Sequence, residues 1–218
     1  MRLKRLIQKK SKKFIIKKLS NNFSTLFQAF NMSKRPYGDI PYVNVKFKKN
    51  SSLAKKNDNI LLKIDGVILP KILETGNFDV FLINFLKKRI KKNSIFVDIG
   101  SNHGLVSRQV SNISLIKKII YFEPVKEIFD LSIFNTKNIK NIERNNYGWA
   151  KKEGYKLFFE NPSNSGDFSL IPSKQRTIKH KFKFANAKTE LKKILNNNKQ
   201  KFKIILKTDC QGYDLSLI

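Results

Sequence analysis

The chain has 218 residues, of which 40% are hydrophobic, and its 45 lysine and arginine residues against 16 aspartate and glutamate residues give a formal net charge of +29. Its length suits one domain with an extension. The single cysteine, Cys210, excludes a disulfide within the chain and a zinc site built from cysteines. No apolar stretch approaches the roughly 20 residues that a membrane-spanning helix needs, so we expect a cytoplasmic protein, or one that lies peripherally on a membrane.

The charge comes from 38 lysines and only 7 arginines, and two interpretations of it stay open. Lysine, asparagine and isoleucine share A/T-rich codons, so the composition of the genome is one explanation. The other is a polyanionic partner: a membrane surface, an acidic glycan or RNA. The scarcity of arginine argues against nucleic acid, because the planar guanidinium is the group that best binds phosphate and base edges in two-pronged fashion.

Residues 1–50 are expected to form a basic extension. Its apolar core, "FII", is too short for a secretory signal. A basic helix that lies on an anionic membrane surface is one interpretation of this segment, and a solvated, partly frayed helix is the other. The apolar residues that recur there at loosely helical spacing among lysines are Leu3, Leu6, Ile7, Phe14 and Leu19.

Two elements are predicted after this extension. The stretch "NILLKIDGVILP", residues 59–70, predicts two short strands around Asp65 and Gly66, since Asp-Gly between apolar runs is a strong hairpin signal. The segment "NFDVFLINFLKKRIKKN", residues 77–93, has an apolar spacing that predicts a helix buried on a broad face and ended by its lysines.

From residue 94 onward apolar strands alternate with helices. The strands are "SIFVDIG", "KKIIYFEP", the weaker "NIERNNYGWA" and "KFKIILKTDC", with helices expected after the first two. Such alternation predicts a parallel sheet covered by helices on both faces. Sheets of this kind bind ligands beyond the carboxyl ends of their strands, where this chain places Asp98, Glu123 and Asp209.

The turn after the first of these strands has the pattern D-x-G-x-x-x-G. Gly100 and Gly104 permit a tight turn and a close approach of a ligand to the backbone. The start of the helix behind them adds N–H donors and a partial positive charge. Glu123 ends the next strand 19 residues after Gly104, at the position of the carboxylate that binds ribose hydroxyls in nucleotide-binding sheets. These features favour a nucleotide-like ligand.

Four blocks in this order, "FVDIGSNHG", "YFEP", "NNYGWAKKEGYKLFFENPSNSGDFSL" and "IILKTDCQGYD", resemble the FkbM-type S-adenosylmethionine-dependent methyltransferase family. The upstream "ILETGNFD" also looks like the lead-in of this family. The resemblance covers roughly residues 58–218. It implies a domain over residues 51–218 with an α/β fold, a mostly parallel, Rossmann-like methyltransferase sheet of seven strands. Because the chain ends at Ile218 after the fourth of these strands, we expect the domain to be incomplete at its C-terminus.

The resemblance also implies a binding site for S-adenosylmethionine. Glu123 would bind the ribose hydroxyls, and Asn146 and Tyr147 would border the adenine. Helix capping by Asp98, an ion pair of Glu123 with a surface lysine, and structural roles for Asn146 and Tyr147 are the alternatives. Since Glu123 is expected at the mouth of the sheet, we expect Glu123→Ala to leave the unliganded stability unchanged. The residues assigned to the methionine part of the cofactor are Asp98, Gly100, Ser101, Asn102 and Gly104.

The implied chemistry is transfer of a methyl group from a sulfonium to an acceptor hydroxyl, without a metal, so the protein positions the acceptor and removes its proton. Asp209 is the first candidate for the base, His103 is the second because imidazole titrates near neutral pH, and Gln211 could orient the acceptor. Gln211 stands where the family has a glutamate. We expect an O-methyltransferase acting on a glycan, a lipid-linked saccharide or a similar small acceptor. The alternatives are an RNA methyltransferase and a non-catalytic basic binding module with a degenerate cofactor site.

Overall fold

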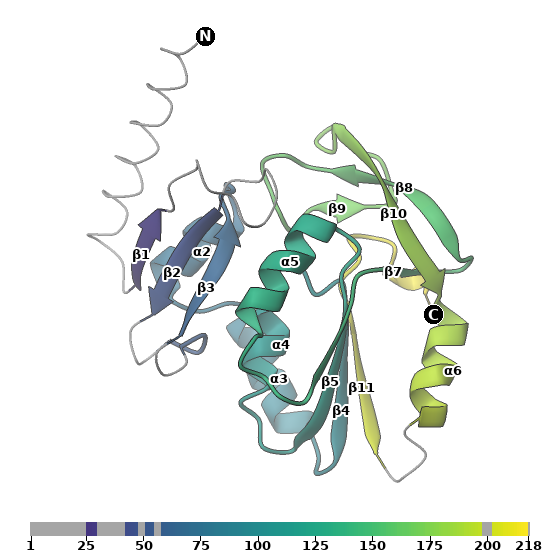
Figure 1. The fold of residues 1–218 in the computed structure, drawn as a ribbon, viewed down its shortest axis with the longest axis horizontal. Coiled ribbons are helices and arrows are strands. Elements are labelled where there is room, and N and C mark those ends of the chain that lie inside the picture. Colours follow the sequence, from purple (N-terminus) through teal and green to yellow (C-terminus); the bar gives the residue numbers. More distant parts are fainter. Residues whose placement is uncertain (1–24, 30–41, 48–50, 55–57, 198–201, 218) are drawn as a thin grey trace.

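The computed structural model describes residues 25–29, 42–47, 51–54, 58–197 and 202–217. These residues form an α/β fold with three sheets, as Figure 1 shows. The α/β class expected from the sequence is therefore confirmed. The helix expected within residues 1–19, and with it the membrane contact proposed for that segment, lies outside the described residues. None of the described helices is long and apolar enough to cross a bilayer.

The central sheet is parallel and has the strand order β11-β4-β5-β6. Its register places Asp98 of β4 between Tyr121 of β5 and Lys207 of β11. The strands follow the apolar runs that the sequence analysis identified, and the weak third run contributes only the short edge strand β6 to this sheet. The bounds are Ser94–Ile99 for β4, Ile116–Phe122 for β5, Ile142–Asn145 for β6 and Lys203–Thr208 for β11.

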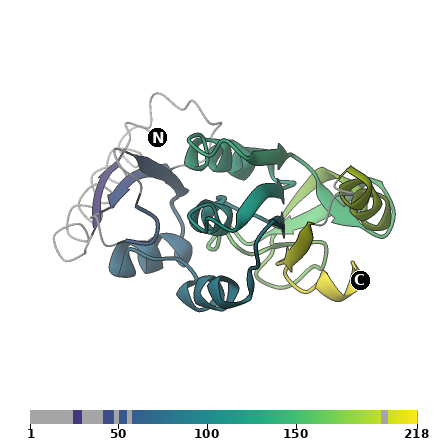
Figure 2. The same cartoon turned by 90° about the horizontal axis from the view of Figure 1, so that it is seen from below.

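Helices cover both faces of this sheet, as predicted. Alternate side chains of β4 point to opposite faces, so Phe96 packs with Val106 of α4, whereas Ile95 and Val97 pack with Ile194 of α6. Seen from below in Figure 2, α3, α4 and α5 line one face of the sheet and α6 lies on the other. The bounds are Val80–Arg89 for α3, Leu105–Val110 for α4, Lys126–Asn135 for α5 and Ala187–Asn197 for α6.

The first sheet is antiparallel and lies beside α4 and α5 (Figure 1). Val43 and Val45 of β2 are fully buried against Ile60 and Leu62 of β3. Part of the stretch expected to form a basic extension therefore belongs to the hydrophobic core. The bounds are Thr25–Ala29 for β1, Tyr42–Phe47 for β2 and Asn59–Lys63 for β3.

The hairpin predicted around Asp65 and Gly66 is wrong, because the residues that follow form α2, Ile68–Thr75. Asp65 Oδ1 accepts hydrogen bonds from the backbone N–H groups of Val67, at 3.1 Å, and Leu69, at 3.0 Å. These donors belong to the start of the helix, where N–H groups lack partners within the helix itself. Pro70 lies in the first turn, where its missing N–H is tolerated. The Asp-Gly pair thus starts a helix instead of closing a hairpin.

A second sheet, with the order β7-β10-β8-β9, packs over the carboxyl ends of the parallel strands (Figure 1). The sequence analysis did not predict it. Strand β7 takes the second half of the run that was expected to form one strand. The inward side chains of β8 and β10, Phe158 and Phe184, form one core with Phe168 of β9. The bounds are Gly148–Ala150 for β7, Gly154–Glu160 for β8, Phe168–Ser169 for β9 and Ile178–Asn186 for β10.

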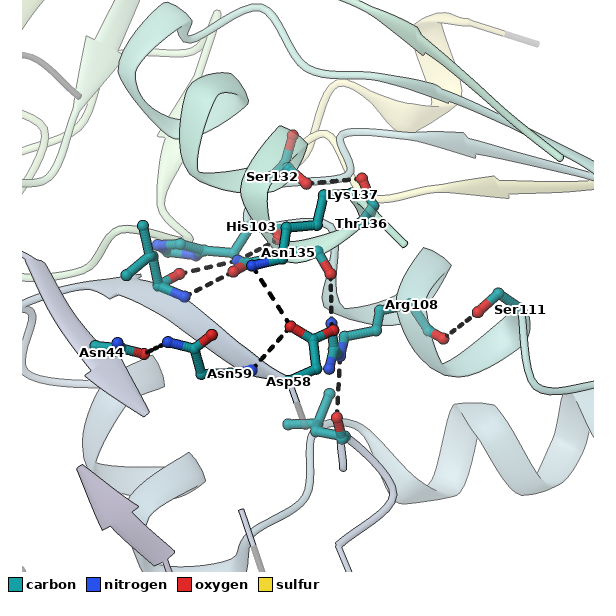
Figure 3. Close-up of polar contacts among 12 residues, drawn as sticks. Asn44, Asp58, Asn59, His103, Arg108, Ser111, Ser132, Asn135, Thr136 and Lys137 are labelled. Carbon is teal, nitrogen blue, oxygen red and sulfur yellow. Dashed lines mark hydrogen bonds and ion pairs between the residues drawn. The ribbon is translucent and has the colours of Figure 1, made fainter. Parts of the chain in front are cut away.

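A buried polar network joins the first sheet to α4 and α5, as Figure 3 shows. Asn135 Oδ1 accepts from the N–H of Leu61 at 2.6 Å, and its amide group donates to the carbonyls of Leu61 at 2.8 Å and His103 at 2.9 Å. Arg108 donates to Asp58 Oδ2 at 3.0 Å, and both side chains are 1% exposed. Because unpaired buried polar groups are costly, the network fixes how these elements dock.

Candidate functional site

A cavity of about 240 Å³ lies between the carboxyl ends of the parallel strands and the second sheet. This volume is slightly below the range of roughly 300–1,000 Å³ typical of small-molecule sites, so the cavity suits a small ligand or part of a larger one. One half of its wall is apolar, from Ile68, Phe78, Trp149, Phe158, Phe168 and Phe184. The other half is polar, from Ser101, Asn102, Glu123, Lys207, Asp209 and Gln211.

The turn between β4 and α4 forms the base of the polar half. Gly100 has φ +75°, and a Cβ there would lie 2.3 Å from the backbone carbonyl oxygen of Asp209. Only glycine therefore allows β11 to end directly against this turn. Gly104 has φ +72° and faces Ser132 of α5 and Thr136, the residue after that helix, so its role is to pack α4 against α5. The structure thus places Gly100 in the cavity wall and Gly104 in a helix contact.

Glu123 lies at the end of β5 and reaches the cavity, although its residue is only 5% exposed. Its carboxylate accepts the backbone N–H of Asn102 at 2.8 Å and that of Val125 at 2.9 Å. Burial raises the pKa of Glu123 to about 7, and these two hydrogen bonds oppose the shift. A carboxylate has about four acceptor sites, so two remain for a ligand. Glu123 thus lies at the mouth of the sheet, but it is buried there, so the premise that a residue at the mouth does not belong to the core is wrong.

Asp98 and Lys207 form a buried ion pair beneath the cavity. The Lys207 Nζ lies 2.9 Å from Asp98 Oδ1, and the hydroxyl of Ser107 donates to Asp98 Oδ2 at 2.8 Å. Asp98 is fully buried, and it is Lys207 that lines the cavity. Burial opposes the charge of Lys207, but Asp98 and Asp209 outweigh it and raise the pKa of the ammonium. The alternative that Asp98 caps a helix is wrong, because its carboxylate binds the Lys207 ammonium and the Ser107 hydroxyl.

Lys207 was missed by the sequence analysis. Its ammonium also donates to the carbonyl of Gly100 at 3.3 Å and lies 3.9 Å from Asp209 Oδ2. The signal in the sequence was its position on β11, two residues before Asp209, because side chains two positions apart along an extended chain point to the same side. The ion pair with Asp98 depends on the pairing of β11 with β4, which the local sequence does not specify.

Asp209 and Gln211 lie together at the rim of the polar half. The Gln211 amide donates to Asp209 Oδ1 at 3.2 Å, and the Asp209 side chain is 57% exposed. Burial of the remainder raises the pKa of Asp209; Lys207 opposes this shift, and Asp98 adds to it. The structure therefore brings the first candidate base and the candidate orienting residue to one place, open to an acceptor from solvent.

His103 is not among the described residues that line the cavity. Its residue is 1% exposed, and its Nε2 accepts the backbone N–H of Lys63 at 3.0 Å. Burial lowers the pKa of His103 to about 4, so the ring is neutral at physiological pH. The imidazole is thus a buried acceptor that holds β3 against the turn after β4. The geometry gives the second candidate base no access to an acceptor.

Asn146 and Tyr147 also lie outside the cavity wall. The Asn146 amide donates to the backbone carbonyl of Glu123 at 2.9 Å, and the Tyr147 hydroxyl donates to Glu190 Oε2 at 2.9 Å. These contacts match the structural roles that were the alternative to adenine binding. The next two residues along the chain, Gly148 and Trp149, line the cavity instead.

Two buried polar atoms in the cavity wall have no hydrogen-bond partner among the described residues. They are the hydroxyl oxygen of Ser101 and the indole Nε1 of Trp149, in residues that are 5% and 3% exposed. Native structures rarely leave buried polar atoms unpaired. A ligand with hydrogen-bond acceptors would supply partners for both groups. Ser101 was among the predicted residues, whereas Trp149 was missed.

The described residues contain no group of three or more His, Cys, Asp or Glu side chains that could hold a metal ion. Comparison of the chain with protein-family models, with curated proteins and with solved structures found no match. The chemistry of the site therefore has to be judged from its own geometry. That geometry is a half-aromatic, half-polar cavity with a buried carboxylate, a buried ammonium and an accessible aspartate.

Proposed function

We propose that the chain is an S-adenosylmethionine-dependent O-methyltransferase built on a Rossmann-like methyltransferase sheet. Its acceptor is a hydroxyl of a glycan, a lipid-linked saccharide or a similar small molecule. The observation that carries the proposal is the cavity at the carboxyl ends of the parallel strands, which is lined by Glu123 and by Ser101 and Trp149, each with a buried polar atom that lacks a partner among the described residues. This is where an open parallel sheet binds a nucleotide-like ligand, and the sequence resemblance to FkbM-type methyltransferases supports the same cofactor.

The residues of the cavity fit this cofactor in a changed arrangement. Glu123 has acceptor capacity left for ribose hydroxyls, and the aromatic wall suits the adenine. Because Asp98 is paired with Lys207 and buried, the lysine would take its place as the charged group for the methionine part, whose carboxylate an ammonium can bind. Ser101 and Trp149 each offer one donor. When bound, the cofactor supplies a methyl group already activated on a sulfonium.

The protein's own contribution is then to hold the acceptor and take its proton. Asp209 is exposed at the rim and is the group that would accept the hydroxyl proton, as general bases do within hydrogen-bond reach. Lys207, 3.9 Å from Asp209 Oδ2, favours the ionised form of that carboxylate and so opposes the burial that raises its pKa. Gln211 already donates to Asp209 and would orient the acceptor through its remaining amide atoms.

The proposal is tested by cofactor binding. Trp149 is the sole tryptophan of the chain and lines the cavity, so its fluorescence reports occupancy directly. We expect saturable quenching by S-adenosylmethionine in the wild type, and an affinity roughly 10- to 100-fold weaker for Glu123→Ala, from the loss of charge-assisted hydrogen bonds. Calorimetric titration gives the same affinities independently.

Glu143→Ala is the matched control, because Glu143 is an exposed glutamate on the neighbouring strand β6. It should bind the cofactor as the wild type does. Each variant is first checked for a cooperative melt, since Glu123 holds two backbone N–H groups in the folded state. Equal affinity of folded Glu123→Ala and wild type would remove Glu123 from the site, and absence of any binding to the wild type would reject the proposed function.

A further inference from the structure

Helix α3 exposes an aromatic surface that the packing of the domain does not use. Its inward side, Ile83 and Leu86, is buried in the core, yet Phe81 on the other side is 86% exposed and Val80 and Phe85 are each 47% exposed. Phe81 is the most exposed aromatic side chain among the described residues. It lies one helical turn from Phe85, so the two rings form one patch. Exposed apolar patches of this kind mark interaction surfaces.

The same helix is strongly basic at its C-terminal end. No acidic residue lies within α3, and Lys87, Lys88 and Arg89 form its last turn, followed by Lys91 and Lys92. The Arg89 guanidinium lies 4.9 Å from the centre of the Phe85 ring, so a cation sits directly beside the apolar patch. Aromatic side chains flanked by lysine and arginine are typical of helices that lie in the interface of an anionic membrane.

The position of α3 makes its exposed side accessible. In Figure 2, α3 and the C-terminal segment lie along the same outer side of the molecule. The two residues before the helix, Phe78 and Asp79, line the cavity. Further exposed apolar side chains follow or precede cavity residues, with Val67 50% and Ile171 44% exposed next to Ile68 and Leu170. The N-terminal end of α3 therefore adjoins the cavity wall.

From the exposed rings of α3 and the cations beside them, we propose that α3 docks the protein on an anionic lipid bilayer. Phe81 and Phe85 enter the interface, while the lysines and Arg89 contact lipid phosphates. The long lysine side chains can extend toward the headgroups as the rings go deeper. The net charge of +29 adds a long-range attraction to the same surface. This inference does not depend on the proposed function, and it uses residues other than those of the basic N-terminus.

Insertion is measured with a tryptophan reporter on the full chain. Phe81→Trp is mixed with vesicles of neutral phosphatidylcholine containing anionic phosphatidylglycerol, with and without brominated acyl chains. We expect a blue shift of the emission and quenching by the brominated lipid. Tyr155→Trp is the matched control, because Tyr155 is 68% exposed on β8 in the second sheet. It should show neither effect, nor should the buried Trp149 of the wild type.

Affinity is measured by vesicle sedimentation. The double variant Phe81→Ser, Phe85→Ser should partition roughly 10- to 100-fold less than the wild type, because two rings no longer leave water. Binding should fall steeply when phosphatidylglycerol is omitted. No quenching of Phe81→Trp, or equal partition of the double variant, would overturn the proposal even if the N-terminus binds vesicles.

Two other occupants of the surface are separated by the same variants. Wild-type dimers that the double variant converts to monomers, without an effect on vesicle binding, would assign the patch to a second copy and overturn the proposal. A double variant that loses RNA binding but still binds vesicles as the wild type does would assign the patch to nucleic acid and would also overturn the proposal. The cofactor titration uses no vesicles and the docking assays use no cofactor. A failure of the docking proposal is therefore distinguishable from a failure of the methyltransferase proposal.

Discussion

Glu123→Gln should make the protein more stable than the wild type at alkaline pH. The wild-type carboxyl has its pKa raised by burial to about 7, from an ordinary 4.5. Between these two values the folded state binds a proton that the unfolded state has released. The free energy of unfolding therefore falls as pH rises through this window and is constant above it. Glutamine resembles the protonated acid in shape and carries no such cost.

The size of the effect follows from the two pKa values. Integrated from pH 5 to pH 8, the shift of one carboxyl removes roughly 2–3 kcal/mol from the wild type and nothing from the variant. Between pH 5 and pH 8, the unfolding free energy of Glu123→Gln should therefore rise by that amount relative to the unfolding free energy of the wild type. The substitution also changes the unfolding free energy by an amount that does not depend on pH. The glutamine amide has one acceptor oxygen, whereas the carboxylate uses two to accept the N–H groups of Asn102 and Val125.

The assay is urea unfolding of the unliganded proteins at several pH values between 5 and 8. Glu143→Gln is the control, since it removes an exposed carboxyl from the neighbouring strand and should run parallel to the wild type. Parallel curves for Glu123→Gln and the wild type would refute the reasoning, because they would mean that Glu123 is already ionised or solvated in the folded protein.

Three further variants test other contacts. Gly100→Ala should cost at least about 3 kcal/mol of unfolding free energy, from a left-handed φ and a clash with the Asp209 carbonyl; a urea midpoint near the wild type would contradict the close approach. Asn135→Ala should cost roughly 2–5 kcal/mol, because it leaves buried backbone groups of Leu61 and His103 unpaired, and a change within about 0.5 kcal/mol would show that they find other partners. Asp209→Asn should lower methyl-transfer turnover by roughly 100-fold with cofactor affinity unchanged; comparable turnover would remove Asp209 as the base.

The parallel sheet and its helices could be predicted because their signals are local. Strands β4, β5 and β11 are apolar runs that end in an acid, and the helices after β4 and β5 have their own apolar spacing. The same local patterns misled at Asp65 and Gly66, where Asp-Gly fits both a hairpin and the start of a helix. The spacing of Ile68, Leu69, Ile72 and Leu73, all buried on α2, is helical and was the signal that could have decided it.

The second sheet had a readable signal in β10. Lys179, Lys181 and Lys183 alternate there with side chains turned toward the core, which is the period of a strand with one solvated face. The ion pair of Lys207 with Asp98 had no such signal, because residues 109 positions apart meet only through the strand register. For the same reason, sequence spacing alone could not show that Asp98 is sealed and Trp149 faces the cavity.

The buried amide of Asn135 has a consequence for amide hydrogen exchange. The N–H of Leu61 is held by this side chain and that of Lys63 by the ring of His103, so both are released only when β3 separates from α5 and the turn after β4. That turn is also the base of the cavity. The first sheet and the cavity wall should therefore open in one cooperative event. A ligand that holds the turn closed should slow exchange of the β3 amides, although no residue of β3 lines the cavity.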